Sequence, residues 1–370
     1  MTYLDYASAE PVRPEVLNEL RGNAELFYNP SSVSELGRMN RRSIEATRAL
    51  IAEMIHCDPE EIYFTSGASE SNSWAIDGFL KAYENSTVIS TNIEHSSILN
   101  NPAVKPLILS DSNGFIHPEA IEETKSSWSK NTLLVIGHAN NEVGSIQDIE
   151  VLRKFCPDCY LLVDAAQTFA KLPIDVKAMG IDMLSASAGK VGGIRGTGFL
   201  YISKRMKIDP IIYGTQENGL RGGTYFDLGI RSFYFALQHP YNAMSVGLKR
   251  NFLLSKLNEI LEVQVIGSVE NRLPNNVLIK IKNVTVDSQQ MITLLEDHGF
   301  LVSAGSACHA GSPDLSHVLA ALGETPESAK TVIRVTLGED TDVNELDRFT
   351  NTLNSIIEMF HIKPKEASPL

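Results

Sequence analysis

Between about residues 60 and 205, short runs rich in β-branched and aromatic residues alternate with segments of helical periodicity. The expected strands are Glu61–Thr65, Thr87–Thr91, Thr132–Gly137, Tyr160–Asp164, Met183–Ser187 and Gly198–Ile202. Expected helices between them include Ala68–Ala82 and Asp148–Phe155. Such alternation is typical of a mostly parallel sheet with helices on both faces. The sequence therefore predicts an α/β fold with a ligand crevice at the carboxyl ends of the strands.

The pattern changes near residue 245, where the regular alternation stops. Before the alternating segment, apolar side chains at helical spacing predict one long helix, Ser34–Ile55. After it we expect a further helix and then strands Val263–Ile266 and Asn276–Ile281, a helix near Gln289–Asp297, strand Ile333–Thr336 and helix Val343–Phe360. The predicted organisation is a large domain over residues 15–245 and a smaller α+β domain of residues 1–14 and 246–370.

Charge and cysteine content exclude several classes of protein. With 32 Lys and Arg against 45 Asp and Glu, the net charge is −13, which disfavours direct binding of nucleic acid. No apolar run approaches the roughly 18 residues of a membrane span, and the N-terminus does not resemble a secretory signal. Four cysteines in 370 residues indicate a reducing compartment, so we expect a cytoplasmic protein.

One lysine and one carboxylate follow neighbouring expected strands. Lys190 stands after Met183–Ser187 and before a glycine-rich turn, which permits close approach of the backbone to a ligand. An ordinary lysine is solvated, whereas a lysine in a confined pocket can form a Schiff base. Asp164 ends the preceding apolar strand. It is either a helix cap or ion-pair partner, or the partner of the pyridinium nitrogen of pyridoxal phosphate.

Three more strand ends carry polar groups. The run Phe64-Thr-Ser-Gly67-Ala-Ser69 leads from a strand into a helix, whose free N–H groups suit a phosphate, although an ordinary capped helix start fits equally. His95 follows another strand and is either structural or catalytic. The run His138-Ala-Asn-Asn141 ends a third strand, where an asparagine also serves as a turn residue.

The cysteines divide into two kinds. Cys308 stands among Gly, Ser, Ala and Pro, so we expect it in a loop, where an accessible thiol suits nucleophilic transfer. Cys156 and Cys159 form a CxxC motif. A zinc site needs a second pair of ligands, and no such pair lies nearby in the sequence, so we expect these two thiols to be structural and predict no metal.

Taken together, these residues resemble those of the cysteine desulfurases, which are pyridoxal-phosphate enzymes of the class V aminotransferase family. The resemblance covers nearly the whole chain, and the order and spacing of its motifs make it specific. The matching segments are Tyr3-Leu-Asp5-Tyr-Ala, Asn29-Pro-Ser-Ser, Phe64-Thr-Ser-Gly-Ala-Ser-Glu-Ser, Glu94-His95, His138-Ala-Asn-Asn-Glu-Val-Gly144, Val163-Asp-Ala-Ala-Gln167, Gln216-Glu-Asn-Gly-Leu-Arg-Gly-Gly-Thr224, Gly305-Ser-Ala-Cys308 and Ile333-Arg334-Val-Thr-Leu-Gly338. It implies a fold-type I architecture with a sheet of seven strands.

The resemblance also implies roles around the ring of pyridoxal 5′-phosphate. Lys190 would hold the cofactor as a Schiff base and later take the α-proton of the substrate. Asp164 would pair with the pyridine nitrogen, and Gln167 and Asn141 would bond the phenolic oxygen. His95 would stack on the ring and help to move protons.

Further roles concern the phosphate. Ser69, Ser187 and the backbone near Ala68 would hold it. Thr224 would reach the phosphate of the other subunit, so the resemblance implies a homodimer.

The remaining roles concern L-cysteine and its sulfur. Asn29 and Arg334 would grip the carboxylate of L-cysteine. Cys308 would attack the sulfur, and the resulting persulfide would pass to an acceptor protein, since the loop resembles the long form that serves iron–sulfur scaffolds and thiolation carriers.

Several positions depart from the family pattern. Gly189 replaces the usual histidine before the lysine, Gly193-Ile-Arg-Gly196 replaces Gly-Pro-Lys-Gly, the opening is Asp5-Tyr-Ala, and Ser69 stands where threonine is common. Two alternatives to a cysteine desulfurase remain open. One is a selenocysteine or cysteine-sulfinate-type lyase, and the other is an impaired homologue that acts as a binding partner in sulfur transfer.

Overall fold

The computed structural model describes residues 1–22, 28–305 and 315–362, and its contacts divide the chain into two compact units. The large unit comprises residues 9–141 and 145–241. The small unit comprises residues 1–8, 142–144 and the chain from residue 242 onward. The boundaries expected from the sequence, 14/15 and 245/246, lie a few residues C-terminal to these.

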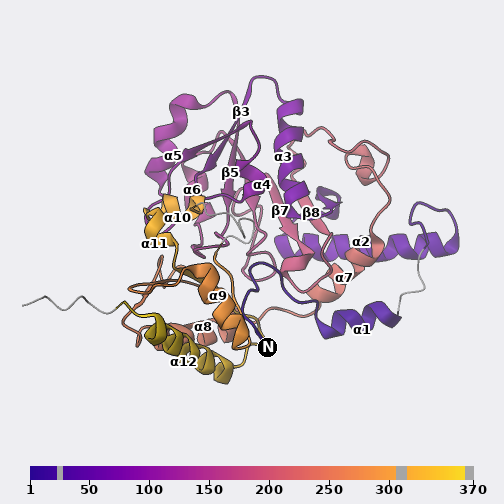
Figure 1. Cartoon of the computed structure of the whole chain (residues 1–370). Helices are drawn as coiled ribbons and strands as arrows, with labels where there is room; N and C mark the ends of the chain where they lie inside the picture. The colour runs from indigo at the N-terminus through magenta and orange to yellow at the C-terminus, as the bar shows by residue number, and fades with distance from the viewer. Residues whose placement is uncertain (23–27, 306–314, 363–370) are drawn as a thin grey trace, which may run out of the picture. The chain divides into compact units, whose positions relative to one another are not determined.

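A sheet of seven strands forms the centre of the large unit (Figure 1). Its order is β2 (Ile62–Thr65), β8 (Gly198–Ile202), β7 (Met183–Ser187), β6 (Tyr160–Asp164), β5 (Asn131–Gly137), β3 (Ser86–Thr91) and β4 (Val104–Ile108). Strand β8 runs opposite to the other six strands of this sheet. The predicted α/β class and the mostly parallel sheet are confirmed.

Alternate residues of the strands face two helical layers, as the two-residue period of a strand requires. Leu133 and Val135 pack with α3 (Ala68–Ala82) and α4 (Ser96–Leu99), while Leu134 and Ile136 belong to the core on the opposite face. Figure 1 shows α3 alongside β7 and β8. The opposite core includes side chains of α1 (Pro14–Gly22), α2 (Glu35–Ile55), α5 (Pro118–Thr124), α6 (Ile149–Lys154) and α7 (Asp227–Leu237).

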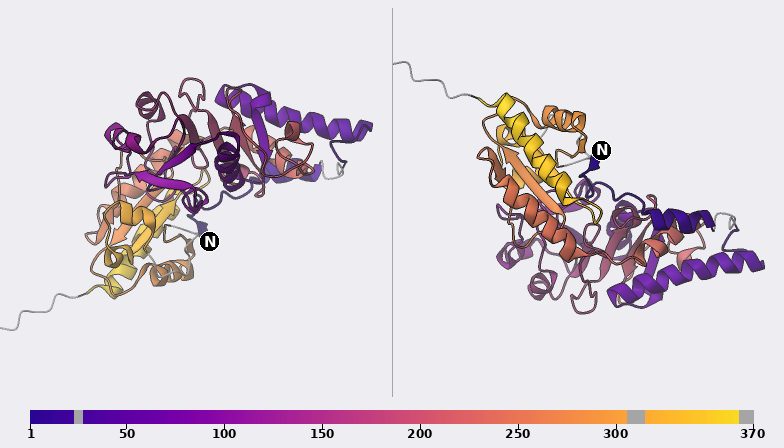
Figure 2. Two further views of the ribbon diagram at one scale, coloured as in Figure 1. Left: turned by 90° about the horizontal axis from the view of Figure 1, so that it is seen from above. Right: turned by 90° about the horizontal axis from the view of Figure 1, so that it is seen from below.

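The small unit contains an antiparallel sheet in the order β12 (Val332–Thr336), β10 (Asn276–Ile281), β9 (Val263–Val265). A parallel pair joins β1 (Thr2–Tyr3) to β11 (Phe300–Leu301). Helix α12 packs against α8 and α9 (Figure 2). The helices of the unit are α8 (Ala243–Leu257), α9 (Ser288–Asp297), α10 (His317–Ala321), α11 (Pro326–Ala329) and α12 (Val343–Phe360). No helix in the described part of the chain is long and apolar enough to cross a membrane.

Candidate active site at the carboxyl edge of the large sheet

The carboxyl ends of five strands meet at one edge of the large sheet. Strands β3, β5, β6 and β7 are parallel, so their ends coincide; Gly137 lies opposite Asp164, and Asp164 opposite Ser185. Strand β2 joins them because Thr65 and Ser187 both pair with Gly198 of β8. The polar residues that follow these strands are therefore gathered on one side of the large unit.

Lys190 ends a short 3₁₀ turn, Ala188–Lys190, that follows β7 directly. Backbone hydrogen bonds fix the turn, since the N–H of Ala188 donates to Thr197 (3.0 Å) and the N–H of Gly193 donates to Ala188 (2.9 Å). The carbonyl of Gly189 also accepts from the N–H of Glu10 at 3.0 Å. Hydrogen bonds therefore fix the backbone on both sides of the half-buried Lys190.

Gly189 and Arg195, both departures from the family pattern, are in contact. A Cβ atom added at Gly189 would lie only 3.1 Å from Cγ of Arg195, closer than most real Cβ contacts. The aliphatic chain of Arg195 therefore occupies the space that a side chain at position 189 would need. The two departures form one packing arrangement beside Lys190.

Asp164 ends β6 with its carboxylate held at both oxygens. Its Oδ1 accepts from the N–H of Ala166 at 2.9 Å, and its Oδ2 accepts from Nδ2 of Asn72 at 2.8 Å. The residue is 9% exposed. Since each oxygen has a donor, the carboxylate plane is fixed, which suits an acceptor that must face one ring nitrogen.

His95 follows β3 and caps helix α4. Its Nδ1 accepts from the N–H of Ser97 at 3.1 Å and lies 2.9 Å from the hydroxyl of the same residue. Because Nδ1 is an acceptor, the neutral imidazole carries its proton on Nε2. The ring therefore has a defined tautomer and a defined orientation.

The start of α3 has free backbone N–H groups at the same edge of the sheet. Its N-cap is Gly67, at φ +153°, and no side chain caps the first N–H groups, which belong to Ala68 and Ser69. A Cβ on Gly67 would lie 3.8 Å from the hydroxyl of Ser187, and a Cβ on Gly198 would clash with the Gly67 backbone at 2.6 Å. Free N–H groups, a neighbouring hydroxyl and Cβ-free walls fit the phosphate of pyridoxal phosphate. Together with Lys190, Asp164 and His95, the edge fits the whole cofactor.

Sequence reasoning missed the residues behind this edge. Asn72 and Ser97 connect Asp164 with His95 through buried and partly buried hydrogen bonds, and Ser185 donates to the amide of Asn72. The sequence does contain a signal for them. Ser185 shares a strand face with Ser187, two residues on, and Asn72 shares a helix face with Ala68, four residues back.

Four other predicted site residues also lie in the large unit. Gln167 is buried, Asn141 is half-buried and Thr224 is exposed. Thr224 lines a pocket of about 150 Å³ together with Thr65 at the end of β2, Thr197 and other residues. Asn29 accepts from the N–H of Ser31 at 2.9 Å.

One predicted residue, Arg334, belongs to the small unit. Arg334, on β12, is 1% exposed, and its Nη2 donates to Asp5 at 2.8 Å and to Ser8 at 2.7 Å. Cys308 lies outside the described residues, so the structure does not place it.

The CxxC motif forms a turn between α6 and β6 in which the two cysteines are buried and the two central residues are exposed. Cys156 is 1% exposed and Cys159 is 4% exposed, and both belong to the apolar core. Within the described ranges, no group of His, Cys, Asp and Glu side chains could hold a metal ion.

Glu94, beside His95, is a fully buried carboxyl. Its Oε1 accepts from Thr91 at 2.6 Å and from the N–H of Gly137 at 2.9 Å. Burial raises the pKa of Glu94 to about 7; the charge of Asp164 adds to this rise, and the two hydrogen bonds oppose it. Between about pH 4.5 and 7 the folded chain therefore keeps a proton that the unfolded chain releases.

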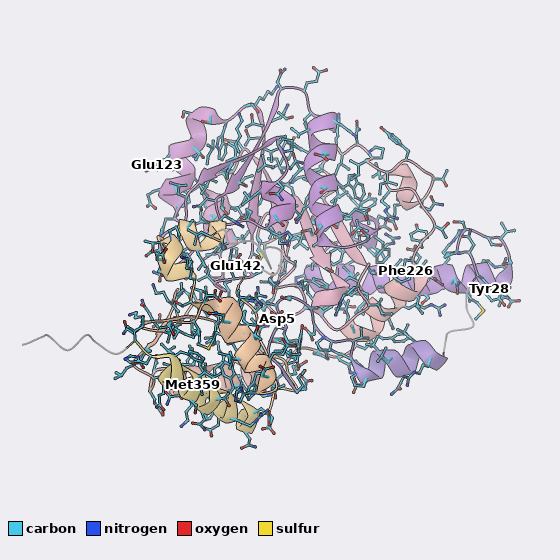
Figure 3. The ribbon with its side chains drawn as sticks, viewed as in Figure 1. Asp5, Tyr28, Glu123, Glu142, Phe226 and Met359 are labelled. Carbon is cyan, nitrogen blue, oxygen red and sulfur yellow. The ribbon has the colours of Figure 1, made fainter. Side chains whose placement is uncertain are left out.

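It follows that Glu94 destabilises the fold progressively as the pH rises through this window. Replacement by glutamine keeps an oxygen for both donors and removes the titration. We expect Glu94→Gln to gain stability relative to wild type by about 3 kcal/mol between pH 5 and pH 8. Urea unfolding at the two pH values measures this gain. The control is Glu123→Gln on the exposed face of α5 (Figure 3), for which the difference from wild type should not change with pH. A pH-independent effect of Glu94→Gln would contradict the assignment.

The chain is similar in sequence and in structure to several known proteins. The aminotransferase class-V family profile matches residues 2–225. A relative named cysteine desulfurase IscS, from Dictyoglomus turgidum, is 36% identical over 379 residues, which cover 96% of this chain and 94% of the relative. A NifS-like protein from Rickettsia africae has a similar structure, with a TM-score of 0.88, 30% identity and coverage of 97% and 99% of the two chains. A structure titled "SspA in complex with cysteine" matches with a TM-score of 0.80, 33% identity and coverage of 92% and 99%.

Proposed function

Since the chain belongs to the cysteine desulfurases of the class V aminotransferase family, we propose that it removes sulfur from L-cysteine, forms L-alanine and carries the sulfur as a persulfide on Cys308. The observation that carries the proposal is the meeting of Lys190, Asp164 and His95 at one sheet edge, beside a phosphate cradle. These residue types match the needs of pyridoxal phosphate, the cofactor on which this family depends.

When bound, pyridoxal phosphate supplies an electron sink for the carbon atom next to the amino group of the substrate. Lys190 would hold the cofactor through its amine, and the same amine would take the α-proton of L-cysteine. The fixed carboxylate of Asp164 would accept a hydrogen bond from the protonated ring nitrogen. His95 presents Nε2–H on the side away from Ser97, where it would donate a hydrogen bond to the ligand.

We propose that Gln167 and Asn141 form hydrogen bonds with the phenolic oxygen of the cofactor. The α3 start, with Ala68, Ser69 and Ser187, holds the phosphate. The pairing of Gly189 with Arg195 argues against loss of activity at this position, because the glycine is accommodated by its neighbour and leaves the Lys190 turn intact.

For the substrate we propose that Asn29 and Arg334 bind the carboxylate of L-cysteine. The thiolate of Cys308 attacks the substrate sulfur: an S–S bond forms while the C–S bond breaks, and the electron pair remains with the carbon fragment. Protonation of that fragment completes L-alanine. The persulfide sulfur then passes to a thiol of an acceptor protein, an iron–sulfur scaffold or a thiolation carrier.

We also propose that the chain acts as a homodimer in the cytoplasm. Several large apolar side chains near the start of α2 and of α7 are exposed in the single chain, among them Val33 at 89%, Tyr28 at 42% and Phe226 at 47% (Figure 3). Asn40 of α2 donates to the carbonyl of Tyr28 and to the carboxylate of Asp227, so these segments lie close together, and exposed apolar groups that lie close together favour a protein interface. Thr224, two residues before Phe226, would then reach the phosphate of the second subunit.

An assay of the purified holoenzyme with L-cysteine and a reductant tests the proposal. We expect L-alanine and sulfide in equal amounts, and a yellow protein whose absorption changes on addition of L-cysteine. Absence of alanine from a fully loaded enzyme would contradict it. Turnover of selenocysteine without turnover of cysteine would favour the lyase alternative instead.

A further inference from the structure

We infer that Asn72 is a positioning residue that fixes Asp164 and His95 at the same time through its one side-chain amide. The inference rests on the proposed function, since it concerns the two groups that would face the cofactor ring. It assigns Asn72 an effect on the reaction although it would contact neither substrate nor cofactor.

The amide of Asn72 has a defined partner for each of its groups. The side chain projects from α3 and is 0% exposed. Its Nδ2 donates one hydrogen to Oδ2 of Asp164 at 2.8 Å and the other to Oγ of Ser97 at 3.0 Å. Its Oδ1 accepts from the hydroxyl of Ser185 at 2.6 Å.

Ser185 fixes which way the amide faces. If the amide turned over, its oxygen would face the carboxylate of Asp164 at hydrogen-bond distance without a proton between them. The hydroxyl of Ser185 would at the same time lose its acceptor. The observed orientation is therefore the one in which every polar atom has a partner, as burial requires.

Ser97 carries the effect of Asn72 to His95. Its Oγ accepts from Asn72, so its own O–H is free to donate to Nδ1 of His95, which lies 2.9 Å away. The backbone N–H of Ser97 donates to the same Nδ1. Both donors hold the imidazole in the tautomer with the proton on Nε2.

One amide thus orients the acceptor of the ring nitrogen and sets the tautomer of the proton-transferring histidine. An aspartate at position 72 has the same shape but no N–H to donate, and it would place a second carboxylate against Asp164. An alanine removes all three hydrogen bonds. We therefore expect Asn72→Asp and Asn72→Ala to disturb Asp164 in different ways. Both variants should disturb His95 in the same way.

The experiment compares Asn72→Ala, Asn72→Asp and Ser97→Ala with wild-type holoenzyme. The readouts are the kcat and KM for L-cysteine, the dissociation constant of pyridoxal phosphate and the pH titration of the absorption band of the bound cofactor. For Asn72→Ala we expect kcat to fall about 10-fold to 100-fold, as for outer-shell partners of metal-bound histidines, with KM little changed. The band titration and the cofactor affinity should also change. Ser97→Ala should lower kcat but leave the affinity for pyridoxal phosphate near that of wild type, because the hydrogen bond from Asn72 to Asp164 remains.

A matched control is Asn101→Ala. It removes an asparagine amide that donates at 2.7 Å to Asp77, a residue of α3 like Asn72. It should leave the band titration and kcat unchanged. If Asn72→Ala does not fold, Ser185→Ala provides the test, since it removes only the contact that orients the amide and should shift the band titration in the same direction. Wild-type values of kcat and band titration in folded Asn72→Ala would overturn the inference. An inactive wild type would instead contradict the proposed function.

Discussion

Replacement of Lys190 by alanine is expected to lower the rate of alanine formation from L-cysteine by about 10⁴-fold or more, the upper end of the range for a positioned proton-transfer group. The reason is that Lys190 has two tasks, to hold the cofactor and to take the α-proton. Its place at the end of the turn after β7 leaves no other lysine on that turn to replace it. Steady-state assays with saturating pyridoxal phosphate measure the loss.

The control for this change is Lys154→Ala, which removes an exposed lysine of α6. It should retain the wild-type rate. Partial rescue of Lys190→Ala by a small primary amine would identify the missing group as the amine. Substantial activity of Lys190→Ala without added amine would contradict the role assigned to Lys190.

Replacement of Cys308 by alanine is expected to reduce alanine formation to background, about 10³-fold or more below wild type, while the yellow colour of the enzyme is kept. The first steps on L-cysteine need Lys190 and not the thiol. The C–S bond, however, breaks only when a sulfur nucleophile attacks. The cofactor spectrum of the variant should therefore respond to L-cysteine without product formation.

Cys57→Ala is the matched thiol control. Burial, together with the nearby Glu61 and Asp58, raises the pKa of Cys57 to about 12, so this thiol stays protonated and unreactive. The variant should turn over L-cysteine at the wild-type rate. If Cys308→Ala retained turnover of selenocysteine but not of cysteine, the selenocysteine lyase alternative would gain support.

The strands that the sequence predicts best are those buried on both faces. Residues Tyr160–Asp164, Met183–Ser187 and Gly198–Ile202 begin and end where expected, because their apolar runs stop at polar residues or glycine. Strand β4 was not predicted, since it is an edge strand with a proline and three exposed central residues. Helix α7 was also missed, because aromatic and β-branched residues within it obscure the helical signal.

The site was predictable where chemistry depends on residue type. Lysine, aspartate and histidine after successive strands can be found from the sequence, because parallel strands place their ends at one edge. The hydrogen bonds of the Asn72 amide could not be predicted, although its helix face could, because its partners Asp164 and Ser185 lie 92 and 113 residues away along the chain. Only the folded α3 on the sheet brings them within hydrogen-bond distance.

The most direct test of the account is a mass measurement on the intact protein after brief reaction with L-cysteine without reductant, followed by peptide mapping. We predict the gain of one sulfur atom, located on Cys308, with an equal amount of L-alanine in solution. The added sulfur should disappear on treatment with a thiol reductant. Alanine formation without added sulfur on Cys308, or added sulfur on Cys57 in its place, would contradict the account.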